Sequence, residues 1–142
     1  MENCKSLQYH EYGDNVFVYQ HGLYDFDGQV SFEFGAGSQS KVMTMAGASV
    51  ESSVPVRRLD NMVLPDRHIS LLKMDIEGSE LKALHGAEGL IRENRPKLAI
   101  CIYHKIEDLW ELPLFIKELN PDYKIYLRNH TDSLDEMVLY AI

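Results

Sequence analysis

Residues 71–87 read LLKMDIEGSELKALHGA, and this stretch constrains the fold most because it joins a strand, a turn and a helix without a break. The apolar residues before the acids predict a strand over 68–76, and the periodicity after them predicts a helix over 79–94. The apolar stripe of the helix consists of Leu81, Leu84, Ala87, Leu90 and Ile91. We expect Ser79 to cap its first turn and Pro96 to end it. A strand that runs into an amphipathic helix is typical of α/β domains.

The rest of the second half continues this alternation. The run KLAICIYH (97–104) predicts a strand buried on both faces, and DLWELPLFIKEL (108–119) predicts a second helix. Two final strands, YKIYLRNH (123–130) and EMVLYAI (136–142), are separated by a short polar loop. We therefore expect these two strands to pair antiparallel.

The first half has weaker patterns. Residues 15–25 and 28–37 are β-rich, and the residues YDFDG at their junction predict a hairpin. Residues 36–53 read as a surface loop, and 54–62 as an extended piece that leads into one turn of helix. Together the elements predict one α/β domain over 1–142, with a mainly parallel sheet and an antiparallel C-terminal strand.

Charge and composition exclude some partners. The chain carries 14 Lys and Arg against 22 Asp and Glu, a net charge of −8 without a basic cluster, so we expect no nucleic-acid partner. No apolar run is long enough to span a bilayer and the first residues lack a signal-peptide core, so we expect no membrane attachment. The two cysteines, Cys4 and Cys101, do not suggest a disulfide framework, which favours a cytoplasmic location.

Titratable side chains follow three of the predicted strands. Asp75 and Glu77 lie at the end of the first strand of the second half, His104 at the end of the next and His130 at the end of the third. Because ligands bind at the carboxyl ends of strands in open α/β sheets, we expect one shared edge, with Asp75, Glu77 and His104 converging on one cleft. Each also has a purely structural explanation, which is helix capping for the acids and surface exposure for the histidines.

The segment KMDIEGSEL, with YHK and YLRNH at later strand ends, resembles the FkbM family of S-adenosylmethionine-dependent methyltransferases. The likeness continues to the end of the chain, and GLYDFDGQVSFEF and VRRLD resemble the middle section of the family. The resemblance implies a Rossmann-like methyltransferase sheet, truncated at the N-terminus, of which the chain matches the C-terminal two-thirds. The glycine-rich turn and the ribose-binding acid of the first two strands have no counterpart here. We therefore expect the isolated chain to bind S-adenosylmethionine weakly or not at all.

The resemblance also implies catalytic roles. Methyl transfer to oxygen requires a base that removes the acceptor proton, and His104 or His130 suits that role because imidazole titrates near neutral pH. Asp75 would face the methionine end of the cofactor or the acceptor, and Glu77 would orient a histidine or the acceptor hydroxyl. The same four side chains leave open a divalent metal site, but nothing in the sequence defines ligand distances, so no metal is assigned.

By the same resemblance, Gly22, Leu23 and Asp75 would contact the cofactor. The implied function is O-methyl transfer to a sugar or small-metabolite hydroxyl, and the sequence does not decide whether this chain is active. The alternative is a non-catalytic α/β interaction or structural module derived from a methyltransferase.

The implied truncation also predicts how strand edges are covered. Without the first two strands, the segments 15–22 and 68–76 would expose apolar edges, and exposed edges invite pairing. We expect these two segments to pair directly with each other. The other options are a homo-oligomer or a partner segment that completes the sheet.

Overall fold

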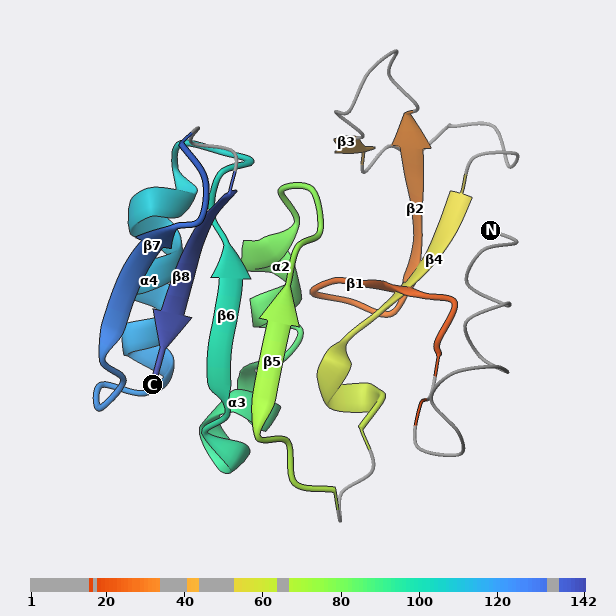
Figure 1. The fold of residues 1–142 in the computed structure, drawn as a ribbon. Coiled ribbons are helices and arrows are strands. Elements are labelled where there is room, and N and C mark those ends of the chain that lie inside the picture. The colour runs from red at the N-terminus through yellow and green to blue at the C-terminus, as the bar shows by residue number, and fades with distance from the viewer. Residues whose placement is uncertain (1–15, 17, 34–40, 44–52, 64–66, 133–135) are drawn as a thin grey trace.

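The computed structural model of the chain describes residues 16, 18–33, 41–43, 53–63, 67–132 and 136–142 (Figure 1). Its strands form two four-stranded sheets. The first sheet has the spatial order β1 (Gly22–Leu23), β4 (Ser53–Arg57), β2 (Gly28–Glu33) and β3 (Lys41–Met43). The second has the order β5 (Leu71–Met74), β6 (Lys97–Cys101), β8 (Met137–Ala141) and β7 (Ile125–Asn129).

The helices cover one face of the second sheet, as Figure 1 shows. They are α2 (Glu80–His85), α3 (Glu88–Asn94) and α4 (Asp108–Leu119), and a 3₁₀ turn, η3 (Leu59–Asn61), follows β4. The core between sheet and helices includes the fully buried Met74, Leu84, Ile91, Leu98, Ile100, Ile102, Leu112, Ile116 and Leu139. None of the helices in the described part of the chain is long and apolar enough to cross a membrane.

The two sheets are joined through packing rather than through strand pairing. Leu23 of β1 and Leu59 of η3 pack against the larger core, although they belong to the part of the chain that forms the first sheet. A smaller buried cluster of Tyr24, Val30 and Val56 lies within the first sheet itself.

The strands and the second helix predicted for the second half are confirmed. β6 is the strand expected in 97–104, and its buried residues lie between β5 on one side and β8 on the other. The helix expected over 108–119 is α4. β7 and β8 pair antiparallel as predicted, with Ile125 opposite Ala141.

The prediction of a mainly parallel sheet is wrong for the described strands. Only two pairings are parallel, β1 with β4 and β5 with β6, whereas four are antiparallel. The α/β class itself is correct. The difference arises because β8 lies between β6 and β7 and is antiparallel to both, and because β2 is antiparallel to β3 and β4 in the first sheet.

The hairpin predicted at the YDFDG junction is also wrong, because β4 separates β1 from β2. The residues of this junction bind the end of β4 instead. The Asp27 carboxylate accepts hydrogen bonds from the Arg58 backbone N–H at 2.8 Å and from the Asn61 side-chain amide at 2.9 Å. The backbone N–H of Tyr24 donates to the Arg57 carbonyl at 3.0 Å. The junction therefore crosses over the adjacent strand rather than reversing into it.

Direct pairing of the segments 15–22 and 68–76 is not observed among their described residues. Gly22 and Leu23 pair with Val56 and Arg57 of β4, while β5 pairs with β6 and forms an edge of the second sheet. A Cβ at Gly22 would lie 3.1 Å from Val56 Cγ1, so the absence of a side chain permits this close approach to β4. The oligomer and partner-segment alternatives remain untested.

The single helix predicted over 79–94 is divided into α2 and α3 at Gly86. The Gly86 carbonyl accepts a hydrogen bond from the Asp60 N–H instead of continuing the helix. Ser79 precedes α2, but its side chain makes no capping hydrogen bond, contrary to the prediction.

Two predictions concern residues that lie mainly outside the described part of the chain. They are the surface loop over 36–53, of which only 41–43 are described and form β3, and the prediction for Cys4. Cys101 is a free, buried thiol.

The first turn of α3 is capped by a side chain that is distant in sequence. Asp60 accepts hydrogen bonds from the Leu90 N–H at 2.9 Å through Oδ1 and from the Gly89 N–H at 3.2 Å through Oδ2, and Arg58 pairs with Oδ2 at 3.3 Å. These are the free N–H groups that an N-cap residue normally satisfies. Arg58 also donates to the carbonyls of Asp25 and His85, at 3.0 and 3.3 Å. The ion pair of Arg58 and Asp60 therefore holds the end of β4 against the helices.

We expect Asp60→Ala to lower the free energy of unfolding by about 1–2 kcal/mol, since the cap and the ion pair are both lost. Chemical denaturation followed by circular dichroism measures the change. Asp122→Ala is the matched control, because among the described residues the Asp122 side chain makes an exposed pair with Arg95 at 3.9 Å, and its removal should change stability by less than about 0.5 kcal/mol. Equal stability of the Asp60→Ala chain and the wild type would contradict the remote cap.

Candidate functional site

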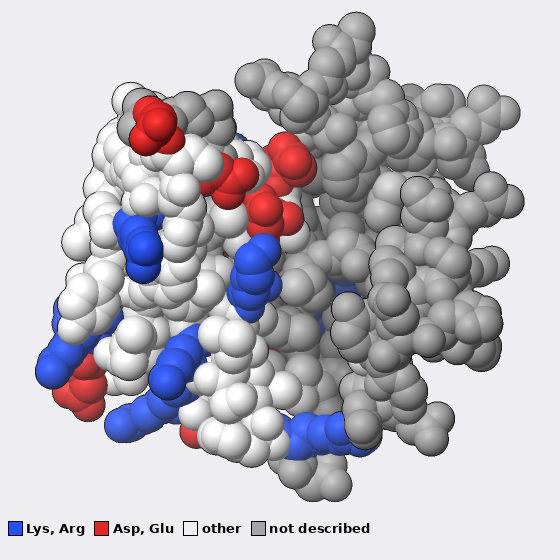
Figure 2. Space-filling view, viewed as in Figure 1, with Lys and Arg blue, Asp and Glu red and all other residues white. Residues whose placement is uncertain are grey.

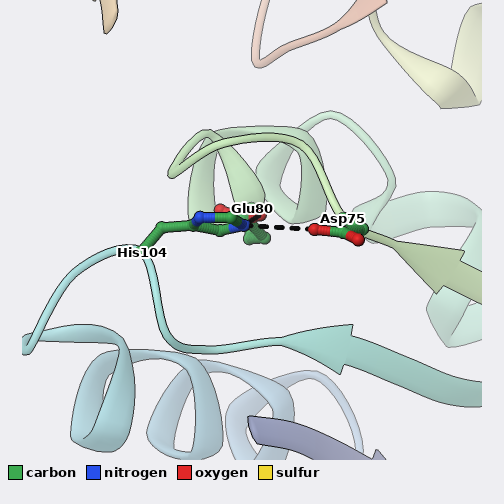
Figure 3. A group of neighbouring side chains, drawn as sticks. All are labelled: Asp75, Glu80 and His104. Atoms are coloured by element: carbon green, nitrogen blue, oxygen red, sulfur yellow. Dashed lines mark hydrogen bonds and ion pairs between the residues drawn. The ribbon is translucent and has the colours of Figure 1, made fainter. Parts of the chain in front are cut away.

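The candidate site lies at the edge of the second sheet toward which β5 and β6 point. These strands are parallel, with Met74 opposite Ile100, so Asp75 after β5 and His104 in the loop after β6 emerge at the same edge. Figure 2 shows acidic side chains gathered at this edge. Figure 3 shows Asp75 and Glu80 pointing toward the imidazole of His104 from the turn and helix that follow β5.

Three carboxylates lie close to the His104 ring. Nε2 is 3.2 Å from Asp75 Oδ1 and 3.4 Å from Glu80 Oε1, and Nδ1 is 3.8 Å from Glu77 Oε2. The side chain of His104 is only 10% exposed, whereas those of Asp75 and Glu77 are 40% and 54% exposed. The Tyr103 hydroxyl donates a hydrogen bond to Asp75 Oδ1 at 3.0 Å. Asp75, Glu77 and His104 therefore meet at one edge of the sheet as predicted, whereas the cleft and their catalytic roles remain predictions.

A sharp backbone turn produces this arrangement. Glu77 and Gly78 both have positive φ angles, of 56° and 85°, in the left-handed region that glycine adopts most easily. The Lys105 ammonium donates to the Gly78 carbonyl and so ties the turn to the loop after β6. The turn brings the first residue of α2 back to the strand, so that Glu80 Oε1 accepts a hydrogen bond from the Ile76 N–H at 2.9 Å.

The environment changes the titration of several groups around Asp75. Partial burial acts to raise the pKa of Asp75, but hydrogen bonds from Tyr103 and His104 outweigh it and hold that pKa below the ordinary value, so the carboxyl is ionised at neutral pH. The pKa of Tyr103 is raised, mainly because the hydroxyl is partly buried and secondly because the Asp75 carboxylate lies beside it. The same two causes raise the pKa of Cys101 to about 11, so its thiol stays protonated and is a poor nucleophile.

Two acids beneath the site are buried without full hydrogen bonding. Glu80 is 0% exposed and Asp108 is 3% exposed. Glu80 Oε2 and Asp108 Oδ2 have no hydrogen-bond partner among the described residues. The pKa of Asp108 is raised, mainly because the carboxyl group is buried and secondly because the Glu80 carboxylate lies nearby. Burial of an unpaired carboxylate is costly, so this pair of acids requires a proton or a cation nearby.

Sequence reasoning missed Glu80 as a member of the site, because an acid in the first turn of a helix is explained by the helix dipole. A signal was available. Glu80 lies three, four and seven residues before Ala83, Leu84 and Ala87, and therefore on the buried stripe of the helix. A carboxylate on the apolar face of a helix has to meet a polar partner or an ion.

The structure does not bring the other predicted site residues to the His104 ring, although β7 runs in the same direction as β6, so that His130 emerges at the predicted edge. His130 follows β7, and its Nε2 lies 2.9 Å from the Tyr140 hydroxyl. Gly22 and Leu23 lie in β1, paired with β4. The roles assigned to these three residues remain predictions. The side chains that could hold a metal ion are Asp75, Glu80 and His104, whose candidate ligand atoms all lie within 4.8 Å of one another.

Comparisons with known proteins agree on one relationship. A family model described as the methyltransferase FkbM domain matches residues 2–134. Among solved structures, the methyltransferase FkbM of Methylobacillus flagellatus is similar, with 30% sequence identity and a TM-score of 0.75. The similarity covers 99% of this chain and 32% of that chain, so the present chain spans about a third of the length of its structural relative. No curated protein matches the sequence.

Proposed function

Because this chain belongs to the FkbM family of methyltransferases, we propose that it transfers the methyl group of S-adenosylmethionine to a hydroxyl oxygen of a sugar or other small metabolite. Membership in the family supports methyltransferase activity in general. The cofactor, the oxygen acceptor and the acceptor class are our proposal. We also propose a cytoplasmic location, which the free thiol of Cys101 supports.

The observation that carries the proposal is the pairing of Asp75 with His104 at the carboxyl ends of two parallel strands. When Nε2 carries a proton, it can donate to the ionised Asp75, and Nδ1 is then free to accept the proton of an approaching hydroxyl. Glu77 lies 3.8 Å from Nδ1 and is more exposed, so its carboxylate is placed to orient that hydroxyl. A positioned base of this kind contributes roughly 100-fold to 10,000-fold in rate.

The fit of the cofactor can be judged from the described residues. Asp75 suits the positively charged methionine end of S-adenosylmethionine, because its carboxylate is partly exposed and ionised at neutral pH. Gly22 gives no independent support, since its lack of a side chain is explained by the contact with Val56. When bound, the cofactor supplies the methyl group, and the chain supplies the charge that orients it and the base that accepts the acceptor proton.

One observation favours the alternative of an interaction module. α4 and the turn before it expose Ile106, Trp110 and Leu114, which are 69%, 50% and 68% exposed and recur at four-residue spacing along one side. β5 is also an edge strand. These features suit contact with a second copy or with a partner segment.

Methyl transfer by the full chain would test the proposal, with formation of S-adenosylhomocysteine measured against a panel of sugar and small-metabolite alcohols. We expect His104→Ala to reduce turnover about 100-fold, because the proton acceptor is lost. His85→Ala is the matched control, since His85 also pairs with a carboxylate, that of Glu88 at 2.9 Å, but lies away from the site. Full activity of His104→Ala would contradict the proposed base. Absence of both turnover and S-adenosylhomocysteine binding in the wild type would favour the interaction module.

A further inference from the structure

We propose that Asp75, Glu80 and His104 bind a divalent cation of the first transition series. The ion would lie between Asp75 Oδ1, a Glu80 carboxylate oxygen and His104 Nε2. Binding of the ion does not depend on methyl transfer. Only its use, to hold the acceptor hydroxyl, rests on the proposed function.

The spacing of the three side chains suits a shared ion. His104 Nε2 lies 3.2 Å from the Asp75 oxygen and 3.4 Å from the nearer Glu80 oxygen. Neighbouring ligands bound at about 2.0–2.2 Å to one ion are separated by roughly 2.8–3.6 Å in tetrahedral or octahedral geometry. The two separations from Nε2 fall in that interval, and the three candidate ligand atoms all lie within 4.8 Å of one another.

Hydrogen bonding alone leaves the cluster incomplete. A ring nitrogen carries at most one proton, but Nε2 faces two carboxylate oxygens, so one of them receives no hydrogen bond from it. Glu80 is completely buried, and its Oε2 has no hydrogen-bond partner in the described part of the chain. A cation at this position would neutralise both carboxylates, so that the buried charge of Glu80 would no longer be uncompensated.

The surroundings resemble the outer shell of a metal site. The Ile76 N–H orients Glu80, and the Tyr103 hydroxyl orients Asp75. With an ion on Nε2, His104 would be a ligand and not the base; its Nδ1–H would face Glu77, which lies 3.8 Å away and would accept the acceptor proton in its place. A carboxylate behind a metal-bound histidine fixes the orientation of its ring and increases its basicity.

The donor set indicates which ions would bind. Two carboxylate oxygens with one imidazole nitrogen suit Mn²⁺ or Zn²⁺ better than Mg²⁺, which prefers oxygen ligands only. Three protein ligands also leave coordination positions open, as in catalytic metal sites. An acceptor hydroxyl in an open position would lose its proton more easily, because the bound cation stabilises the alkoxide.

The test is titration of the full chain with MnCl₂ after removal of metals with a chelator, without cofactor or acceptor. Electron paramagnetic resonance measures free Mn²⁺, and calorimetry with ZnCl₂ gives a second reading. We expect one ion per chain and an affinity at least tenfold weaker in Glu80→Gln and in His104→Gln. Gln at position 80 can still accept the Ile76 hydrogen bond, and circular dichroism checks that both variants fold. Glu88→Gln is the matched control, because Glu88 pairs with His85 away from the site and should leave the affinity unchanged.

Two results would overturn the proposal. The first is no binding by the wild type at millimolar Mn²⁺ or Zn²⁺, which would mean that a proton alone neutralises the cluster. The second is binding that neither variant weakens, which would indicate an adventitious surface site. If Glu80→Gln does not fold, His104→Gln decides by itself. Methyl transfer without metal binding would overturn this inference only, and metal binding without methyl transfer would overturn only the proposed function.

Discussion

Gly86→Ala should lower the free energy of unfolding by about 3 kcal/mol or more, since a β-carbon at this position overlaps backbone atoms that cannot rotate away. The added carbon would lie 2.0 Å from the Tyr24 carbonyl oxygen and 3.3 Å from the Cα of Arg58. Both neighbours belong to backbone, and the Gly86 carbonyl is also bound by the Asp60 N–H at 2.9 Å. Relief of the overlap would therefore separate the chain around β1 and β4 from the helices. Urea unfolding followed by circular dichroism measures the loss.

Gly89→Ala is the control for this substitution. The nearest atom to a β-carbon at Gly89 is the carboxylate Oδ2 of Asp60, at 3.3 Å, and a side chain can yield by a few tenths of an ångström. The gain in helix propensity from Gly to Ala, up to about 1 kcal/mol, offsets part of the contact. We expect a net change within about 1 kcal/mol. A Gly86→Ala chain as stable as the wild type would show that Tyr24 does not pack on the junction of α2 and α3.

Ile100→Ala should cost about 4 kcal/mol of stability, because it leaves a cavity in the centre of the larger core. Ile100 is 0% exposed and lies in β6, opposite Met74 of β5 on one side and Leu139 of β8 on the other. Strands on both sides and helices on one face leave little room for the site to collapse around the missing methyl groups. Unfolding in denaturant gives the difference directly when the dependence of the unfolding free energy on denaturant concentration is the same for the variant and the wild type.

Ile106→Ala removes the same atoms from a position that is 69% exposed. We expect this control to change stability by less than about 0.5 kcal/mol, because little apolar area returns to water. Equal losses in the two variants would mean that β6 does not occupy the centre of the second sheet.

The second half of the fold could be predicted because its patterns are local. Continuous apolar runs and helical spacing identify β6 and α4 without knowledge of their partners, and the short polar loop requires an antiparallel β7–β8 pair. The meeting of Asp75 with His104 followed from the rule that parallel strands end at the same edge. This part of the site was therefore available from the order of the elements.

The errors concern contacts between residues that are distant in sequence. The helix over 79–94 has an unbroken apolar stripe, but Tyr24 and Asp60 divide it at Gly86. The junction at YDFDG has the composition of a hairpin turn, but Asp27 binds the far end of β4. In both cases local propensity was consistent with two structures, and a distant partner decided between them.

The sequence by itself determined where the strands of the second half and α4 form and which edge collects the acids and the histidine, because periodicity and element order suffice for both. Tertiary structure alone decided that Glu80 joins Asp75 at the His104 ring and that His130 contacts Tyr140 instead. The physical reason is that backbone turns decide how deeply a carboxylate is buried and how an imidazole ring is oriented. Here the turn is formed by Glu77 and Gly78, the two residues after β5 with left-handed backbone angles. These turns are stabilised by contacts across the fold, such as Lys105 on the Gly78 carbonyl, which no local pattern encodes.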